Sequence, residues 1–182
     1  IDEAIKMGDR IVIMRDGKLV QFDTPDTLLA HPANKFVRDF VGADRALKRL
    51  GLVRVRSIMD RNPPKVFLDA TIEAVRKRLN EDGLKSAFVI DREDGVLKGW
   101  IERDATRTNT SLLEAMNEAP LQSIAVRETS PAREARSAMG ARRLRITPVI
   151  DKRGRLTGCI TIESLETLAL YDDAPSAAEG LL

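Results

Sequence analysis

Arginine side chains gather in the second half of the chain and are the residues best suited to bind a ligand there. The cluster consists of Arg133, Arg136, Arg142, Arg143 and Arg145. A guanidinium group presents a planar fork of N–H donors that matches a phosphate group. The cluster therefore favours anion binding in a cleft or at a seam between two chains, where it would suit a cyclic dinucleotide. Two other interpretations stay open: the arginines cover solvated helix faces, or they contact an anionic lipid surface with a strength that falls as salt rises.

Other chemistry is excluded by missing residues. The sequence contains no Gly-x-x-x-x-Gly-Lys-Ser/Thr loop to cradle phosphates, so no strand-end Asp is placed beside such a loop to hold magnesium. The single histidine, His31, precedes Pro32 in an expected loop, and the single cysteine, Cys159, is flanked by Gly and Ile as a buried small side chain would be. We predict no catalytic residue and no metal site, and we expect that this chain does not hydrolyse ATP by itself.

The composition describes a globular protein with little charge bias. Of 182 residues, 43% are hydrophobic, and the net charge is only +2, which is too weak to predict a nucleic-acid partner. A lone cysteine fits a reducing compartment. No apolar run approaches the roughly 20 residues that span a bilayer, and no signal-peptide pattern is present. We expect a cytoplasmic location.

The elements that must position the arginines form an internal repeat. Each copy has an apolar run, an Asp, a Gly-bearing turn and a second apolar run. Asp91 and Asp151 lie sixty positions apart, and Gly99 and Gly158 lie fifty-nine apart. A repeat of this period indicates two copies of one strand-turn-strand unit.

Each copy also predicts a strand and a helix ahead of this unit. In the first copy these are a strand over 65–68 and a helix capped by Thr71 and ended by Gly83, with Ile72, Val75 and Leu79 on one face. In the second copy they are a strand over 120–126 and a helix that Ser130 caps and Gly140 ends. Its apolar face would carry Ala132, Ala135, Ala138 and Met139. A helix over 111–116 would connect the copies, and another would run over 163–170.

The first forty residues have a different pattern. We predict a helix over 1–7 and a hairpin whose turn is Asp16-Gly17, because type I′ turns need positive φ at both central residues. Thr24 caps a helix that His31-Pro32 breaks. A further helix runs over 34–41 and ends at Gly42, with Phe36, Val37, Phe40 and Val41 as its stripe, and residues 44–54 read as a linker with a short amphipathic helix ending at Gly51.

This first stretch resembles the end of the nucleotide-binding domain of ABC transporters. The matching residues are Asp2-Glu3-Ala4, Gly8 to Ile11, Ile13-Met14, Asp16-Gly17, Val20-Gln21, Thr24-Pro25 and Pro32 to Val37. The Pro-Ala-Asn-x-Phe-Val string resembles the importers of glycine betaine, proline betaine, choline or carnitine. The resemblance implies a C-terminal piece of a longer ATPase subunit, with a permease subunit as partner at the inner face of the membrane.

The repeat resembles the CBS domain, which occurs in tandem pairs. We therefore expect an α+β fold, a tandem CBS pair of small mixed sheets with packed helices that follows the end of an ABC ATPase domain. The expected boundaries are 1–43 for the ATPase fragment, 44–54 for a linker, 55–110 and 111–170 for the two CBS domains, and 171–182 for a flexible tail.

The resemblance also implies a ligand, an adenine nucleotide (AMP, ATP or cyclic di-AMP) in the cleft of the pair. The family contacts it from a Gly-x-x-Thr/Ser-x-x-Asp segment. Here the second copy keeps Thr161 but has Ser164 at the Asp position, and the first copy has Glu102 and Ala105 instead. We predict a site in the second copy, although Thr161 is equally a cap for the following helix. The candidate residues are Arg133, Arg136, Arg145, Thr147, Pro148, Thr161 and Ser164.

Two functions remain open at this point. One is regulation of an osmoprotectant importer by sensing ionic strength or an adenine nucleotide. The other is a structural clamp that joins two ATPase subunits and binds nothing. The small residues Ala132, Ala135 and Ala138 favour a homodimer through the helices of the pair, and Trp100 is interpreted as core or as a stacking surface.

Overall fold

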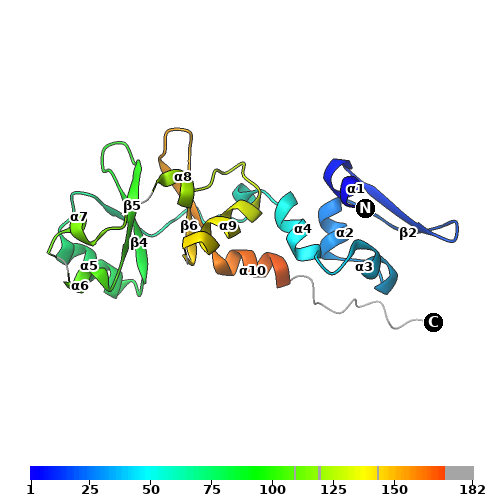
Figure 1. Ribbon diagram of the computed structural model, residues 1–182, viewed down its shortest axis with the longest axis horizontal. Helices are drawn as coiled ribbons and strands as arrows, with labels where there is room; N and C mark the ends of the chain where they lie inside the picture. Colours follow the sequence, from blue (N-terminus) through cyan, green and yellow to red (C-terminus); the bar gives the residue numbers. More distant parts are fainter. Residues whose placement is uncertain (109, 119, 143, 171–182) are drawn as a thin grey trace. The chain divides into compact units, whose positions relative to one another are not determined.

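The computed structural model describes residues 1–108, 110–118, 120–142 and 144–170, and these form two compact units (Figure 1). Unit 1 holds residues 1–54, 131–133 and 163–170; unit 2 holds 55–130 and 134–162. Within the described ranges, no helix has the length and apolar character needed to cross a membrane. The tail over 171–182 and the residue Arg143, both part of the sequence predictions, lie outside the described residues.

Unit 1 begins with α1 (Asp2–Met7) and a hairpin of β1 (Ile11–Arg15) and β2 (Lys18–Asp23). The hairpin turn is the one predicted, since Asp16 and Gly17 have φ values of 51° and 75°. A register shift between Ile13 and Met14 gives the hairpin a local irregularity.

Two capped helices follow the hairpin. Helix α2 (Pro25–Ala30) begins at Thr24, whose side chain accepts a hydrogen bond from the Thr27 amide, and ends before His31 as predicted. Helix α3 (Lys35–Val41) begins at Asn34 in the same way and ends at Gly42 with φ of 95°. Val37 and Val41 are fully buried, but Phe40 is 52% exposed. The predicted four-residue stripe was therefore too wide, because Phe40 only stacks on Phe36 at the edge of the core.

Helix α4 (Arg45–Leu52) packs against α2. Gly51 lies inside this helix and does not end it, because its φ is not in the left-handed region that helix-ending glycines adopt. Helix α10 (Ile162–Leu170), which begins directly after the last strand of unit 2, contributes its later residues to unit 1.

The first copy of the repeat is a three-stranded sheet with one face covered by a helix. A short 3₁₀ turn, η1 (Val55–Ser57), precedes β3 (Lys65–Phe67), α5 (Ile72–Glu81), β4 (Ser86–Ile90) and β5 (Leu97–Glu102). The strand order is β3-β4-β5, with β3 and β4 parallel and β4 and β5 antiparallel. As predicted, Thr71 caps α5, which buries Ile72, Val75 and Leu79 against the sheet. Helices α6 (Ala105–Thr108) and α7 (Leu112–Ala115) follow, and Ser111 caps α7.

The second copy keeps the helix and hairpin but loses most of its first strand. It contains α8 (Leu121–Ile124), α9 (Ala132–Arg142), β6 (Ile146–Ile150) and β7 (Leu156–Thr161). The predicted strand over 120–126 is wrong: Pro120 starts a helical turn, which a proline tolerates, and only Val126 pairs with the sheet, at Val149. Gly140 does not end α9, which continues for two more residues.

The copies are joined by exchanged main-chain pairing. Asp60, which precedes the first sheet, exchanges two hydrogen bonds with Cys159 in β7 of the second copy, at 2.9 and 2.8 Å. Asn117, which precedes α8, does the same with Trp100 in β5 of the first copy, at 3.2 and 2.8 Å. The two hairpin turns also pair with each other, through Leu97 to Gly154 and Leu156 to Gly95.

The repeat glycines make this exchange possible. A Cβ at Gly158 would lie 2.6 Å from the Asp60 carbonyl oxygen, and a Cβ at Gly99 would collide with the carbonyl oxygen of Asn117. Only glycine lets the passing segment approach this closely. Beside these bridges, the apolar side chains of both copies share one core around Phe88, Leu97 and Cys159.

Candidate functional site

A solvent-open cleft lies between the two copies inside unit 2. Its empty volume is about 950 Å³. We call it the inter-copy cleft. Its lining residues are Lys85, Ser86, Trp100, Glu102, Arg103, Asp104, Leu144, Arg145 and Ile146. The edge between β5 and α6 forms one wall, and the segment that enters β6 forms the other.

Cationic side chains predominate slightly in this cleft. Lys85, Arg103 and Arg145 face two carboxylates, Glu102 and Asp104. A main-chain hydrogen bond holds two of the cationic residues next to each other, because the Arg103 amide donates to the Lys85 carbonyl oxygen at 2.8 Å. A mixed cleft with a cationic excess suits a ligand that carries both an anionic group and hydroxyl or amino donors.

Two polar atoms beside this cleft have no hydrogen-bond partner among the described residues. They are Nε1 of Trp100 and Nε of Arg103, and both are buried from solvent. A buried donor without an acceptor costs about 1–3 kcal/mol, so native proteins retain few of them. Trp100 and Arg103 both line the inter-copy cleft.

A narrower apolar recess adjoins the cleft. It shares Ser86, Trp100, Leu144 and Ile146 with the cleft and has an empty volume of about 270 Å³. Its remaining lining is Pro64, Ala87, Phe88, Ile124 and Pro148. The free space inside it is no larger than a water molecule needs, so a ring does not fit here and a ligand would occupy the open cleft.

Of the predicted site residues, Arg145 lines the cleft and Pro148 lines the recess. Thr147 lies between them in sequence but is fully buried, and its hydroxyl donates to the Ala135 carbonyl oxygen at 3.4 Å. Thr161 ends β7 and Ser164 lies in the first turn of α10, outside the lining of both cavities.

The two α9 arginines of the prediction are exposed, and neither lines the cleft or the recess. Arg133 lines a separate cavity within unit 1, with residues of α1 and α4.

The residues that the sequence prediction missed belong to the first copy. Lys85, Trp100 and Arg103 contribute to the cleft, although the site was predicted in the second copy. One signal was available: Lys85 lies sixty positions before Arg145, so the repeat itself places these two cations at equivalent positions. Trp100 on β5 was interpreted as core or as a stacking surface, and it packs beside the core and lines the cleft. No signal in the sequence marks Arg103, which directly follows β5.

The apolar helix faces are covered within the chain. Ile72, Val75 and Leu79 pack in the core of the first copy, and Ala132, Ala135 and Met139 are buried in the second. These buried side chains belong to the chain's own cores, whereas Ala138 on α9 is partly exposed. A homodimer through the helices of the pair stays a prediction.

Cys159 is buried in the core between the copies, as predicted. Burial, assisted by the nearby Asp60 carboxylate, raises the pKa of the Cys159 thiol to about 12. A thiol that stays protonated is a poor nucleophile and metal ligand. Among the described residues, no three His, Cys, Asp or Glu side chains gather where they could hold a metal ion.

Two curated relatives match nearly the whole chain. The carnitine transport ATP-binding protein OpuCA of Listeria monocytogenes is 38% identical over 177 residues, which cover 94% of this chain and 43% of that protein. The osmoprotectant import ATP-binding protein OsmV of Salmonella typhimurium is 36% identical over 162 residues, which cover 88% of this chain and 42% of that protein. The chain thus spans less than half the length of these relatives.

Solved structures resemble the paired copies. Staphylococcus aureus OpuCA aligns with a TM-score of 0.54 at 23% identity, covering 65% of this chain and 99% of that one. The CBS domain pair of protein MJ0100, in complex with 5′-methylthioadenosine and S-adenosyl-L-methionine, gives 0.56 at 21% identity over 64% of this chain and 98% of that one. CBSX2 in complex with AMP gives 0.56 at 20% identity over 64% and 96%.

The family comparison agrees with this fold. The model of the CBS domain matches residues 55–105 and 114–168, which are the two copies of the repeat and more than half of the chain. The exchanged pairing at Asp60 and Asn117, and the two glycines that permit it, join these copies into one pair. The chain therefore belongs to the CBS domain family, as a tandem pair.

Proposed function

We propose that this chain is the regulatory part of the ATP-binding subunit of an osmoprotectant importer, and that an adenine nucleotide in the inter-copy cleft tunes transport. In this proposal residues 1–43 end the ATPase domain, 44–54 link it to the CBS pair, and the pair occupies 55–110 and 111–170. The parent subunit would work as an ABC-type transport ATPase at the inner face of the membrane, with a permease subunit as partner.

The importer assignment is supported by the length of the similarity. The match to the OpuCA and OsmV proteins covers about nine-tenths of this chain, so it includes unit 1 as well as the CBS pair. A betaine-type solute, such as carnitine, choline or glycine betaine, would be the cargo. The cargo site would lie in other subunits of the importer.

The ligand assignment is carried by one observation, the cationic excess of Lys85, Arg103 and Arg145 in an open cleft between the copies. The adenine ring would lie against the Trp100 side chain in the wall of the cleft, and its phosphates would reach the guanidinium groups of Arg103 and Arg145. Glu102 disfavours a phosphate at its own position, so we expect the ribose hydroxyls on that side. The AMP held by CBSX2 and the adenosine compounds held by MJ0100 support the ligand class.

A thermal-unfolding titration tests this function. The wild-type chain is heated with AMP, ATP or cyclic di-AMP at about 100 times the dissociation constant, where a ligand that binds only the folded state adds about 2.7 kcal/mol. We expect at least one of the three to raise the Tm, and GMP and inorganic phosphate serve as controls. No shift with any adenine nucleotide would contradict the ligand assignment.

A second candidate, sensing of ionic strength, is favoured by the exposed guanidinium groups of Arg133 and Arg136 on α9. Exposed charges are screened over about 8–10 Å at cellular salt, so their contact with an anionic membrane would weaken as salt rises. The test is the salt threshold of transport in the complete importer carrying both Arg133→Gln and Arg136→Gln. An unchanged threshold excludes this candidate. If neither experiment shows an effect, the clamp between two ATPase subunits is the remaining function.

A further inference from the structure

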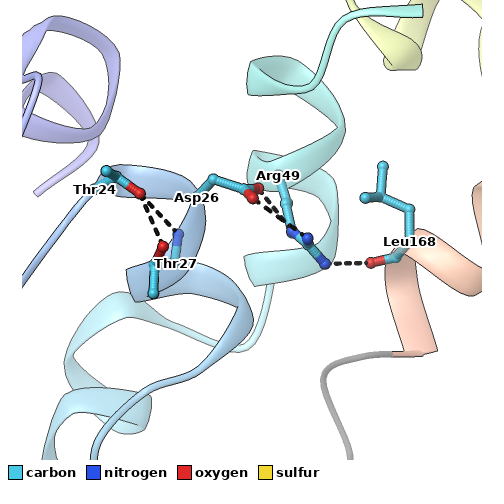
Figure 2. A network of polar contacts seen from close by, with 5 residues as sticks. All are labelled: Thr24, Asp26, Thr27, Arg49 and Leu168. Atoms are coloured by element: carbon cyan, nitrogen blue, oxygen red, sulfur yellow. Dashed lines mark hydrogen bonds and ion pairs between the residues drawn. The ribbon is translucent and has the colours of Figure 1, made fainter. Parts of the chain in front are cut away.

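Arg49 joins three helices through its guanidinium group. Its Nε donates to Oδ1 of Asp26 at 2.7 Å, and a second nitrogen reaches Oδ2 of the same carboxylate at 3.4 Å. Its third nitrogen donates to the carbonyl oxygen of Leu168 at 2.8 Å (Figure 2). The Arg49 side chain is only 14% exposed, whereas the Asp26 side chain is 47% exposed.

Each partner of Arg49 is at a helix end. Asp26 lies in the first turn of α2, next to the Thr24 cap, where its negative charge also suits the helix dipole (Figure 2). Leu168 lies in the last turn of α10, whose carbonyl groups lack partners within the helix. No basic residue occurs in the last turn of α10 itself. Arg49 therefore supplies from α4 the cation and the donor that this helix end lacks.

The other end of α10 is tied to the inter-copy cleft. The amide of Ile162, the first residue of α10, donates to the carbonyl oxygen of Arg145 at 2.9 Å. Arg145 lines the cleft, and β7 continues into α10 without a break. Helix α10 is thus bonded at its start to a residue of the cleft and at its end, through Arg49, to α2.

We propose that Arg49 is the positioning residue through which occupancy of the inter-copy cleft reaches unit 1. A ligand that restricts the motion of the segment around Arg145 would also restrict the start of α10. Arg49, which is bonded to the end of α10 and to Asp26, would extend this restriction to α2. The proposal rests on the proposed function, because it assumes a ligand in the cleft. It adds the route by which binding would reach the ATPase side of the chain.

Arginine makes this connection with a separate nitrogen for each acceptor atom. A lysine at position 49 would keep the charge, but all its donors are on one nitrogen, so the two-nitrogen fork on the Asp26 carboxylate would be lost. Asp26→Asn weakens the link to α2 but leaves the Leu168 bond in place. Arg49→Lys removes the fork on Asp26 but keeps the charge at position 49. Asp26→Asn weakens the connection without changing any residue of α4.

Hydrogen exchange measured by mass spectrometry tests the proposal in the full 182-residue chain. Exchange is followed in α2, α10 and β5 of the wild-type chain, with and without AMP or cyclic di-AMP, after calorimetry has established which of them binds. In the wild type the ligand should slow exchange in β5, α10 and α2, by about fivefold or more in α2, the lower end of typical coupling between sites.

In Arg49→Lys and Arg49→Gln, the ligand should bind with unchanged affinity and still slow exchange in β5, but no longer in α2. Asp26→Asn should behave in the same way. Arg38→Gln, an exposed arginine on α3, should keep the wild-type response and serves as the matched control. Loss of the response in α2 with unchanged affinity is an effect that a merely structural arginine would not produce.

The same ligand response of α2 in the wild type and in both Arg49 variants overturns the proposal while leaving the ligand assignment intact. The absence of nucleotide binding by the wild-type chain is a separate result, seen in the calorimetry, and it overturns the proposed function and this role together.

Discussion

Asp60 precedes the first CBS copy, yet its main chain pairs with Cys159 in the last strand of the second copy, through hydrogen bonds of 2.9 and 2.8 Å. Asn117 and Trp100 repeat this relationship in the opposite direction. Each copy therefore completes its sheet with a segment that belongs to the other. This exchange makes the two copies one folding unit and places Lys85, Trp100 and Arg103 opposite Arg145 in the cleft.

The exchange depends on glycine at two positions. Gly158→Ala should lower the free energy of unfolding by about 1–3 kcal/mol, as added atoms do in closely packed sites, because the new methyl group meets the Asp60 carbonyl oxygen. Gly99→Ala should act in the same direction at Asn117. Urea unfolding followed by circular dichroism measures the change.

Gly140→Ala is the matched control for these variants. A Cβ there meets no atom within 4 Å and lies within α9, so alanine should raise stability by up to about 1 kcal/mol. If Gly158→Ala and Gly140→Ala had the same effect, the close approach at Asp60 would not constrain the fold.

The apolar face of α5 should dominate the stability of the first copy. Leu79 has no exposed surface, and Leu79→Ala should cost about 2–5 kcal/mol, the usual range for a buried leucine. Leu113, which is 63% exposed, provides the comparison, and Leu113→Ala should change stability by about 0.5 kcal/mol or less. Equal losses in chemical unfolding would show that α5 does not pack as the structure has it.

Asp151 should give the second copy a stability that depends on pH. Its carboxylate accepts from the amides of Arg153 and Arg155 at 2.8 and 3.0 Å and from Nε of Arg155 at 2.7 Å. Of these interactions, the hydrogen bond from the Arg155 amide contributes most to lowering the pKa of Asp151 below its usual 3.8. A lowered pKa in the folded state stabilises the protein above the ordinary pKa, and this contribution is lost as the pH falls through the folded value.

Asp151→Asn should therefore reduce stability at neutral pH and leave it nearly unchanged at pH values below the lowered pKa. Unfolding midpoints measured between neutral and strongly acidic pH test this expectation. Asp9→Asn removes an exposed carboxylate outside the turn and is the control. If the difference in unfolding midpoint between Asp151→Asn and wild type stayed constant over the whole pH range, ionisation of Asp151 would not contribute to the stability of the turn.

The Cys159 thiol should be unreactive in the folded protein. Burial raises its pKa to about 12, so almost no thiolate forms at pH 8, and the side chain is covered by the core between the copies. Labelling with iodoacetamide should be slow in buffer and rapid in denaturing urea. Rapid labelling of the native chain would show that the two copies separate readily.

Local features of the fold were predictable from the sequence, and nonlocal ones were not. The turn at Asp16-Gly17 and the caps at Thr24 and Thr71 follow from the chemistry of adjacent residues, and the structure confirms them. Residues 120–126 form a short apolar run that suits a strand or a helix equally. In the structure this run begins with a helical turn directly after Pro120. Spacing alone did not reveal this.

The cleft was harder to predict because its walls meet only through the exchanged pairing. Arg145 was a candidate as a member of the arginine cluster in the second copy, and the structure places it in the cleft. Trp100 lies on β5 of the other copy, which pairs with Asn117, and Arg103 directly follows that strand. Arg133 and Arg136 were candidates from the same cluster, yet neither lines the cleft.

The most direct test of the account is calorimetric titration of the chain with the adenine nucleotide that stabilises it, comparing Arg103→Gln with Arg136→Gln. Since hydrogen bonds to charged groups contribute about 1.5–3 kcal/mol, Arg103→Gln should weaken binding about tenfold or more. Arg136→Gln should bind like the wild type, because Arg136 lies outside the cleft lining. Loss of binding in Arg136→Gln together with wild-type affinity in Arg103→Gln would contradict the inter-copy cleft as the nucleotide site.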